Sequence, residues 1–558
     1  MVPFLRNFCA NGSGTHMISL SQNCLRKTSN LETPVIEKFT PRNGRHAEPV
    51  LKPGTITISI IAIYITGAVL RTIQFAGRSS LWFDELTNAL NVQGRTFFEL
   101  ATKPLDFNQV APPGFLILEK FATVILGETD HAFRLFPWLF SLAALPLFHS
   151  IAKRFLKDIY LLVAFLFFAI CGSQLFYSGE GKPYSGDVTI SLFMVLTSFR
   201  LLEEKMKTRN AIFLAITGGL LITTSLPAVP LGLMLMGLCG FAHLNHRLES
   251  PTSSILIVIT GWFIGCVLGY LYAMNVISNT VQDAMTRYWS EGFAPMRGSL
   301  HLIGWIVSTV FEQFNFFLSS WTYLEYPAIR GVGLVILLFV IPGLIFLGRI
   351  TLFRTLAVMS PFVLALLLAI TKTLPFEGRV AIYATWPFLI VGLGGMQYIA
   401  QSLRKFVDPR LWRIIAVALP VPFLLVMIFT PTERPPFHEQ PSQLVLKEMK
   451  KKMQPGDVIY VYNKAKLAMR FYGPREGFTD YQVSGTFDFI DPYYRELDKL
   501  KGKPRVWFFY TQWTKKQPYP DGIKKYLNKI GKQIDVVPDP FGANEELEAA
   551  AYLYDLSE

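Results

Sequence analysis

The stretch "TITISIIAIYITGAVLRTIQFAGRSSLWFDEL", residues 55–86, joins a long apolar run to a short polar segment. The apolar part has about the length, roughly 20 residues, that an α-helix needs to cross a bilayer. Two adjacent acids, Asp84 and Glu85, follow it closely. The stretch therefore predicts a transmembrane helix that delivers two carboxylates to one face of a membrane.

The composition of the whole chain indicates the same class of protein. Of its residues 51% are hydrophobic and 14% aromatic, while charged residues are held to 17%, which is more apolar than is usual for a soluble protein of this length. We predict a polytopic α-helical membrane protein with roughly eleven spans and amphipathic helices in the outer loops. The spans are expected at about residues 56–76, 135–153, 159–177, 185–201, 210–225, 227–243, 253–277, 331–348, 354–371, 380–400 and 411–430.

The distribution of basic residues indicates how the chain is oriented in the membrane. The net charge is +13, but the basic residues cluster at the ends of apolar runs and not on one broad face, which argues against nucleic acid as a partner. The clusters predict a multi-pass protein of the plasma (inner) membrane, with the N-terminus in the cytosol and the C-terminus outside. Within 82–130, Glu119 and Lys120 would be costly at mid-bilayer, so this region predicts an interfacial helix. Residues 302–320 predict a far-side amphipathic or re-entrant segment.

Three regions follow from these patterns. Residues 1–52 predict a disordered cytosolic tail, 53–431 the transmembrane domain, and 432–558 an extracytoplasmic α/β domain. In the last region the expected strands are 457–463, 505–512 and 549–556, and the expected helices 440–453 and 521–531. It contains no phosphate loop, metal spacing or nucleophile elbow. We therefore interpret it as a cap or recognition domain without chemistry, packed near the loops of the bundle.

Two more charged segments reach the same face as Asp84 by the count of spans. "SGEGKPYSGD" (178–187) and "TLPFEGR" (373–379) contribute Glu180, Lys182, Asp187, Glu377 and Arg379. Alone, the two acids could simply start a helix, and a single cation could be a snorkelling anchor. Together they suit sugar transfer from a lipid-linked phosphate, which needs a base for the acceptor and cations for the departing phosphate.

Several segments, in this order, resemble GT-C glycosyltransferases of the protein O-mannosyltransferase and lipid A aminoarabinose transferase type. They are "LWFDEL", "VAPPGFLILEKF", "FRLFPWLFSLAALPLFHSIAKRF", "QLFYSGEGKPYSGDV" and "GRVAIYATWPFLIVGLGG". The resemblance implies a GT-C fold and an inverting, mannosyltransferase-like enzyme that uses a polyprenyl-phosphate-linked sugar, with Asp84 as the base. The other implied site residues are Glu85 at the catalytic position, Lys182, Arg379 and Tyr184 at the donor phosphate, and Glu180 as a supporting acid.

The chain departs from the family pattern at three positions. Ala111 stands where the family has a histidine or an acid that can bind metal, Lys182 replaces an arginine, and Val380 replaces a tyrosine. The five cysteines offer no metal spacing. The sequence therefore predicts no metal site, although a divalent metal stays open as a cofactor.

Two functional questions remain open at this point. A transporter or flippase of a lipid-linked glycan is the alternative class, but transporters place ionisable residues within spans and show repeated halves. The acceptor could be a lipid, a glycan or a protein, and membrane lipids are expected partners. For the acids we expect Asp84 to have a raised pKa, and Glu85 to orient the loop or to pair with a cation such as Lys182.

Overall fold

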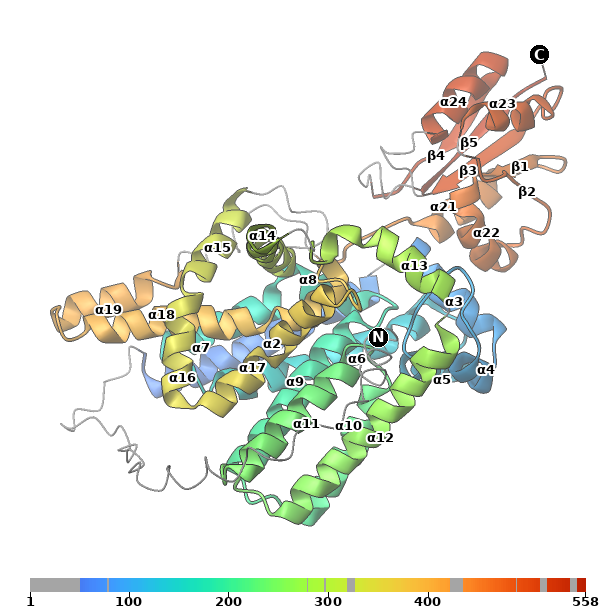
Figure 1. Ribbon diagram of the computed structural model, residues 1–558. Coiled ribbons are helices and arrows are strands. Elements are labelled where there is room, and N and C mark those ends of the chain that lie inside the picture. Colours follow the sequence, from blue (N-terminus) through green and yellow to red (C-terminus); the bar gives the residue numbers. More distant parts are fainter. Residues whose placement is uncertain are drawn as a thin grey trace.

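The computed structural model describes residues 51–77, 80–277, 279–295, 298–318, 327–421, 435–487, 489–511, 519–541 and 549–557. A bundle of helices carries a small sheet domain at one end (Figure 1). This confirms the predicted fold class of a polytopic helical protein with a C-terminal α/β domain. The predicted tail falls almost wholly outside the described residues.

Five helices are long and apolar enough to cross a membrane: α2 (Pro53–Gly77), α6 (Asp130–Ala152), α9 (Tyr184–Glu203), α12 (Thr252–Val276) and α17 (Leu352–Ile370). Three bent pairs also pass: α7 (Asp158–Ile170) with α8 (Gly172–Phe176) and η1 (Tyr177–Gly179), α15 (Pro327–Leu338) with α16 (Val340–Ile350), and η3 (Gly378–Ala384) with α18 (Pro387–Leu403). The shorter apolar helices are α10 (Thr208–Ile222) and α11 (Ala228–Leu244). The candidate spans coincide with eight of the ten expected spans from 56–76 to 380–400, and α10 and α11 coincide with the other two but are shorter than a candidate span. The last expected span begins in α19 (Pro409–Ala418) and continues outside the described residues.

The remaining helices of this region lie between the spans. They are α3 (Phe83–Gly94), α4 (Phe97–Thr102), α5 (Pro113–Leu126), α13 (Asn279–Tyr288), η2 (Ser290–Gly292) and α14 (Ser299–Leu318). Neither α5 nor α14 is among the candidate spans, and their interfacial placement stays a prediction. In α5, Lys120 donates a hydrogen bond to the carbonyl of Val92 at 2.9 Å, and Glu119 is buried.

The break between α7 and α8 is stabilised by a buried arginine. The two parts meet at an angle of 47°, and a break in a helix leaves carbonyl groups without their usual partners. Arg71 of α2 donates to the carbonyls of Ala169, at 2.6 Å, and Phe168, at 3.3 Å. The bend therefore satisfies its backbone inside the bundle, and it directs the following segment, 177–184, across the end of α2.

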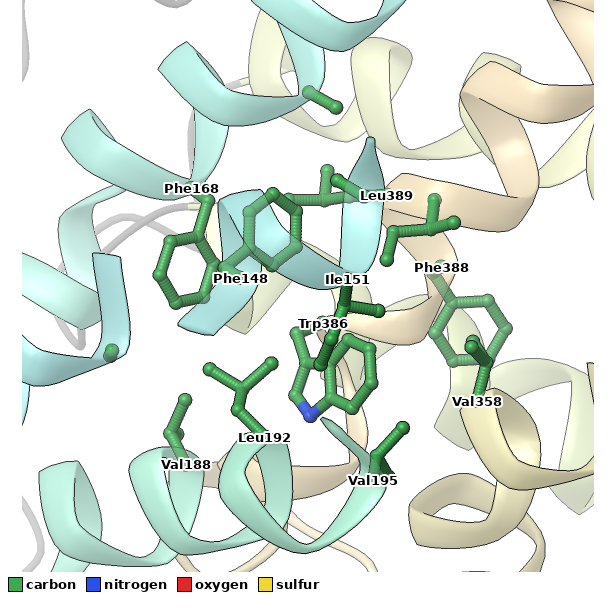
Figure 2. Close-up of a cluster of buried hydrophobic side chains, with 14 of the residues drawn as sticks. Phe148, Ile151, Phe168, Val188, Leu192, Val195, Val358, Trp386, Phe388 and Leu389 are labelled. Atoms are coloured by element: carbon green, nitrogen blue, oxygen red, sulfur yellow. The ribbon is translucent and has the colours of Figure 1, made fainter. Parts of the chain in front are cut away.

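A core of aromatic and aliphatic side chains joins η3 and α18 to α6, α7 and α9 (Figure 2). Trp386 is fully buried, and its indole N–H donates to Ser191 Oγ at 3.0 Å. Beside it, the rings of Phe148 and Phe168 stack with centroids 4.2 Å apart. Interiors packed in this way tolerate little displacement, so η3 has a fixed position relative to the central helices.

The C-terminal domain is a five-stranded sheet in the order β2-β1-β3-β5-β4. Its strands are β1 (Val458–Val461), β2 (Gln482–Val483), β3 (Val506–Thr511), β4 (Lys532–Val537) and β5 (Ala549–Asp555). Strand β1 runs parallel to β2 and β3, whereas β5 is antiparallel to β3 and β4. Around the sheet lie α21 (Ser442–Lys452), η4 (Asn463–Ala465), α22 (Lys466–Tyr472), η5 (Pro474–Glu476), α23 (Asp491–Asp498) and α24 (Tyr519–Ile530). The three expected strands and two expected helices are present.

This domain shares one hydrophobic cluster with the segment between α2 and α6. Leu81, Leu86 and Leu90 belong to the same buried cluster as Leu467 and Phe471 of α22, and Figure 1 shows the domain beside α3. Because the cluster is continuous, the domain and this segment bury apolar surface against each other. The C-terminal domain therefore packs directly on the segment that carries Asp84.

Glycine permits close packing of α10 against α12, and this generates a first prediction. A Cβ at Gly265 would lie 2.4 Å from the carbonyl oxygen of Gly219, so Gly265→Ala must push the two helices apart. We expect it to lower the free energy of unfolding by about 1–3 kcal/mol. The thermal midpoint of the purified protein in detergent measures the effect.

Gly237 of α11 is the matched control, because nothing lies within 4 Å of the place its Cβ would take. Gly237→Ala should raise the stability by about 0.5–1 kcal/mol, the usual difference between the two residues in a helix. Equal midpoints for the two variants would contradict the close approach of α10 and α12.

Candidate active site

Asp84 lies in the first turn of α3 between two cations. Its Oδ1 is 3.0 Å from Lys182 Nζ, and its Oδ2 is 3.1 Å from Arg379 Nη2. The three residues come from α3, from the turn before α9 and from η3. The structure thus brings together the three charged segments that the sequence placed on one face.

The ammonium group of Lys182 is surrounded by acceptors. Besides Asp84 it reaches Gln109 Oε1 at 3.0 Å and Asn88 Oδ1 at 3.3 Å, and its side chain is only 5% exposed. It does not extend toward solvent as a snorkelling anchor would. Sequence reasoning missed Asn88 and Gln109. The spacing of Asn88, four residues after Asp84 on the same helical face, was a signal that could have found it.

Arg379 is enclosed by aromatic rings. Its guanidinium carbon lies 5.6 Å from the ring centroid of Trp289, 5.7 Å from Trp82 and 5.8 Å from Tyr184. Rings at this distance attract a cation without neutralising it, so they fix the guanidinium and preserve its charge. Tyr184 therefore lies at the predicted cation, whereas Trp289, from the loop after α13, was not anticipated.

Glu85 points away from Asp84 into the protein. Its Oε2 accepts from Arg134 Nη2 at 2.6 Å, and its Oε1 accepts from Arg134 Nε at 2.8 Å and from the Gly181 N–H at 2.6 Å. Of the two roles expected for Glu85, pairing with Lys182 is wrong, because neighbouring helical residues face different directions and α3 turns Asp84 and Asn88 toward that lysine. Glu85 holds α3 against α6 and against the backbone next to Lys182.

Glu180 supports the site from behind Trp82. It is fully buried, and its Oε1 accepts from the Trp82 indole N–H at 3.3 Å. Since Trp82 forms one wall around Arg379, Glu180 orients that wall. Of the other acids on this face, Asp187 is buried in α9 and Glu377 lies against Gly292.

The pKa of Asp84 contradicts the expectation of a raised value. Burial alone would raise the pKa, but Lys182 and Arg379 outweigh burial and hold the pKa below its ordinary value. The carboxylate is therefore ionised near neutral pH. Because folding lowers the pKa of Asp84, its ionised form stabilises the folded protein at any pH above the pKa that Asp84 has in the unfolded chain. This stabilisation is lost as the pH falls through the pKa of Asp84 in the folded protein.

Glu119 is a second buried carboxyl near the site. Both of its oxygens are buried without a hydrogen-bond partner, and Oε1 lies 3.5 Å from the place a Cβ on Gly181 would take. Burial raises the pKa of this carboxyl well above its ordinary value, while the charge of Lys182 opposes this shift and the charge of Glu85 adds to it. The sequence indicated only that Glu119 avoids the bilayer. The structure places it in the wall beside Lys182.

The positive charge described at this site comes from the side chains of Lys182 and Arg379. Within the described ranges, no group of three or more histidine, cysteine or acidic residues is arranged to hold a metal ion. At Ala111, the carbonyl accepts a hydrogen bond from the Tyr272 hydroxyl at 3.0 Å. Lys182 and Arg379 are cations that could oppose the charge of a phosphate here.

The ion pair of Glu85 with Arg134 generates a second prediction. Both side chains are at most 1% exposed, and removing one charge of such a pair leaves the other buried alone. We expect Glu85→Gln to lower the free energy of unfolding by about 3–5 kcal/mol. Thermal or denaturant unfolding of the purified protein measures it.

A surface pair in the same loop is the control. Glu99 and Lys103 form an exposed pair four residues apart, at 2.7 Å, so Glu99→Gln should change the stability by about 0–1 kcal/mol. A loss as small as this for Glu85→Gln would be inconsistent with an anchoring role.

No protein-family model and no curated protein matches this chain. Solved structures with a similar arrangement include ArnT from Cupriavidus metallidurans in the apo state, with 11% identity, 90% of this chain and 98% of that chain covered and a TM-score of 0.49. The same protein bound to undecaprenyl phosphate has 12% identity, with 90% of this chain and 98% of that chain covered and a TM-score of 0.48. An oligosaccharyltransferase from Archaeoglobus fulgidus in complex with Zn and sulfate has 11% identity, with 89% of this chain and 73% of that chain covered and a TM-score of 0.46. At TM-scores below 0.5, these likenesses assign this chain neither a substrate nor a reaction.

Proposed function

We propose that the protein is a membrane-embedded inverting glycosyltransferase that moves a sugar from a polyprenyl-phosphate donor to an acceptor at the outer face of the membrane. The observation that carries the proposal is the position of Asp84 between Lys182 and Arg379. Sugar transfer from a lipid phosphate needs a carboxylate base and cations for the leaving group in one place. The resemblance of the surrounding motifs to GT-C enzymes supports the same reaction.

In the proposed reaction, Asp84 takes the proton of an acceptor hydroxyl. The acceptor oxygen forms a bond to the anomeric carbon from the side opposite the phosphate, which inverts the configuration. The bond from that carbon to the phosphate oxygen breaks, and the polyprenyl phosphate leaves with the electron pair. Lys182 and Arg379 stabilise the charge that develops on the phosphate, with Tyr184 holding Arg379 in place.

Donor binding explains how a carboxylate with a lowered pKa can act as the base. A donor phosphate competes with Asp84 for Lys182 and Arg379, the two groups that lower the pKa of Asp84. Each contact that Asp84 gives up raises its pKa and makes it a stronger base. The base is therefore activated when the donor is in place, and water meets a weaker base in the absence of donor.

Charge at the two ends of the bundle supports an extracytoplasmic site. Asp84, Lys182, Arg379 and the C-terminal domain belong to one end. The basic loops 153–157, 205–209 and 404–413 follow the other ends of α6, α9 and α18. By the positive-inside rule the second end is cytosolic, so the N-terminus is cytosolic and the C-terminus extracytoplasmic.

The alternative of a transporter or flippase receives less support. Transport routes place ionisable residues inside spans near the midplane. Arg71 lies within the candidate span α2, but it is engaged with the backbone carbonyls at the break of α7. The ion pairs of Asp84 lie at one end of the bundle, which suits a reaction centre.

The third prediction tests the base. Purified protein given a panel of polyprenyl-phosphate sugars, with lipid, glycan and peptide acceptors, should transfer at least one sugar. Asp84→Asn should lower the rate about 10²–10⁴-fold, the usual contribution of a general base, with expression unchanged. Asp106→Asn is the control, because Asp106 is an exposed acid of the same loop paired with Arg95. A rate for Asp84→Asn within a few-fold of wild type would refute the assignment.

The fourth prediction concerns the leaving group. If Lys182 stabilises charge that grows as the phosphate departs, Lys182→Met should lower kcat more than it weakens donor binding. Lys182→Arg keeps the charge and should retain much of the activity. Lys120→Met is the control, because Lys120 is a cation of the same region that bonds to a backbone carbonyl. Unaltered turnover in Lys182→Met would remove this residue from the mechanism.

A further inference from the structure

The helix that carries Asp84 is not capped by its own N-cap residue. The first N–H groups of any helix lack partners within the helix and need acceptors from elsewhere. Trp82 is the N-cap residue of α3, and its side chain makes no capping hydrogen bond. The Trp82 N–H itself is accepted by Glu85 Oε2 at 3.2 Å, which leaves the N–H groups on either side to be satisfied by other segments.

These acceptors come from the far end of the chain. The Leu81 N–H donates to the Tyr472 hydroxyl at 2.6 Å, and the Phe83 N–H donates to Gln440 Oε1 at 3.0 Å. Tyr472 is fully buried, and Gln440 is 1% exposed. Gln440 thus accepts the N–H of the first helical residue, and Tyr472 holds the residue just before the N-cap, whereas a local serine or aspartate would accept from the second or third helical N–H.

Tyr472 also connects α3 to α6. Its hydroxyl donates to Asp130 Oδ2 at 2.8 Å, at the first residue of α6. Burial raises the pKa of Tyr472 well above its ordinary value, so the hydroxyl keeps the proton that this bond requires. One turn further along α6, Arg134 holds Glu85. The start of α3 is therefore fixed from α6 and from the C-terminal domain together.

We propose that the C-terminal domain caps α3 and thereby positions Asp84, with Tyr472 and Gln440 as positioning residues. The domain is then part of the active-site architecture and not a separate recognition module. The inference rests on the proposed function only for its kinetic consequence. Loss of the cap frays the first turn of α3, where Asp84 lies, and a displacement of about 1 Å at a reacting group can lower turnover about a hundredfold.

The test is the fifth prediction and compares two buried tyrosines of the full-length protein. Tyr472→Phe removes the hydroxyl that contacts Leu81 and Asp130. Tyr460→Phe is the matched control, because the Tyr460 hydroxyl donates to Glu496 Oε2 at the same 2.8 Å but inside the C-terminal domain. We expect kcat to fall about tenfold to a hundredfold in Tyr472→Phe, with the donor KM unchanged and with the control close to wild type.

Amide hydrogen exchange of residues 80–91 supplies a readout that needs no activity. Exchange there should increase in Tyr472→Phe and in Gln440→Met and stay at the wild-type level in Tyr460→Phe. Unchanged exchange in both cap variants, or an equal increase in the control, would overturn the inference. If the wild-type protein transfers no sugar, the proposed function fails, and the exchange comparison still decides whether the domain caps α3.

Discussion

The buried ion pair of Glu85 with Arg134 is the contact on which the site depends. Its two short hydrogen bonds join α3 to α6, and the same carboxylate accepts the Gly181 N–H. One side chain thus fixes three segments that are distant in sequence. A buried pair of this kind contributes little net stability compared with apolar packing, but breaking it is costly. Its value here is geometric, because it determines which face of α3 meets Lys182.

The two adjacent acids, Asp84 and Glu85, lie in different environments. Glu85 is buried and fully engaged, and a charge in that setting is stable only while its partners stay in place. The Asp84 side chain is 14% exposed and contacts two cations that a ligand phosphate could also attract. Because neighbouring helical residues point in different directions, one short motif supplies both a buried anchor and a carboxylate that contacts Lys182 and Arg379.

The sequence predicted the spans and the meeting of Asp84, Lys182 and Arg379, because apolar runs and the count of crossings determine which segments share a face. It could not predict which cation each acid contacts, since that depends on the rotation of α3 about its axis. Trp289 was missed because its place beside Arg379 follows from tertiary packing. The pKa of Asp84 was misjudged for a related reason: burial is readable from a sequence pattern, but distances to cations are not. Strand β2, with two residues, is too short for any periodicity to reveal.

The site consists of two halves with different supports. Lys182 and Arg379 belong to the bundle, where the bend after α7 and the core around Trp386 fix them. Asp84 belongs to α3, which is held by α6 and by the C-terminal domain. The distance from Asp84 to the two cations is therefore set by the fit between the bundle and α3. An acceptor or a lipid-linked donor that enters between the halves would act on this distance directly. Under the proposed function, that arrangement would let substrate binding control how strongly the cations suppress the basicity of Asp84.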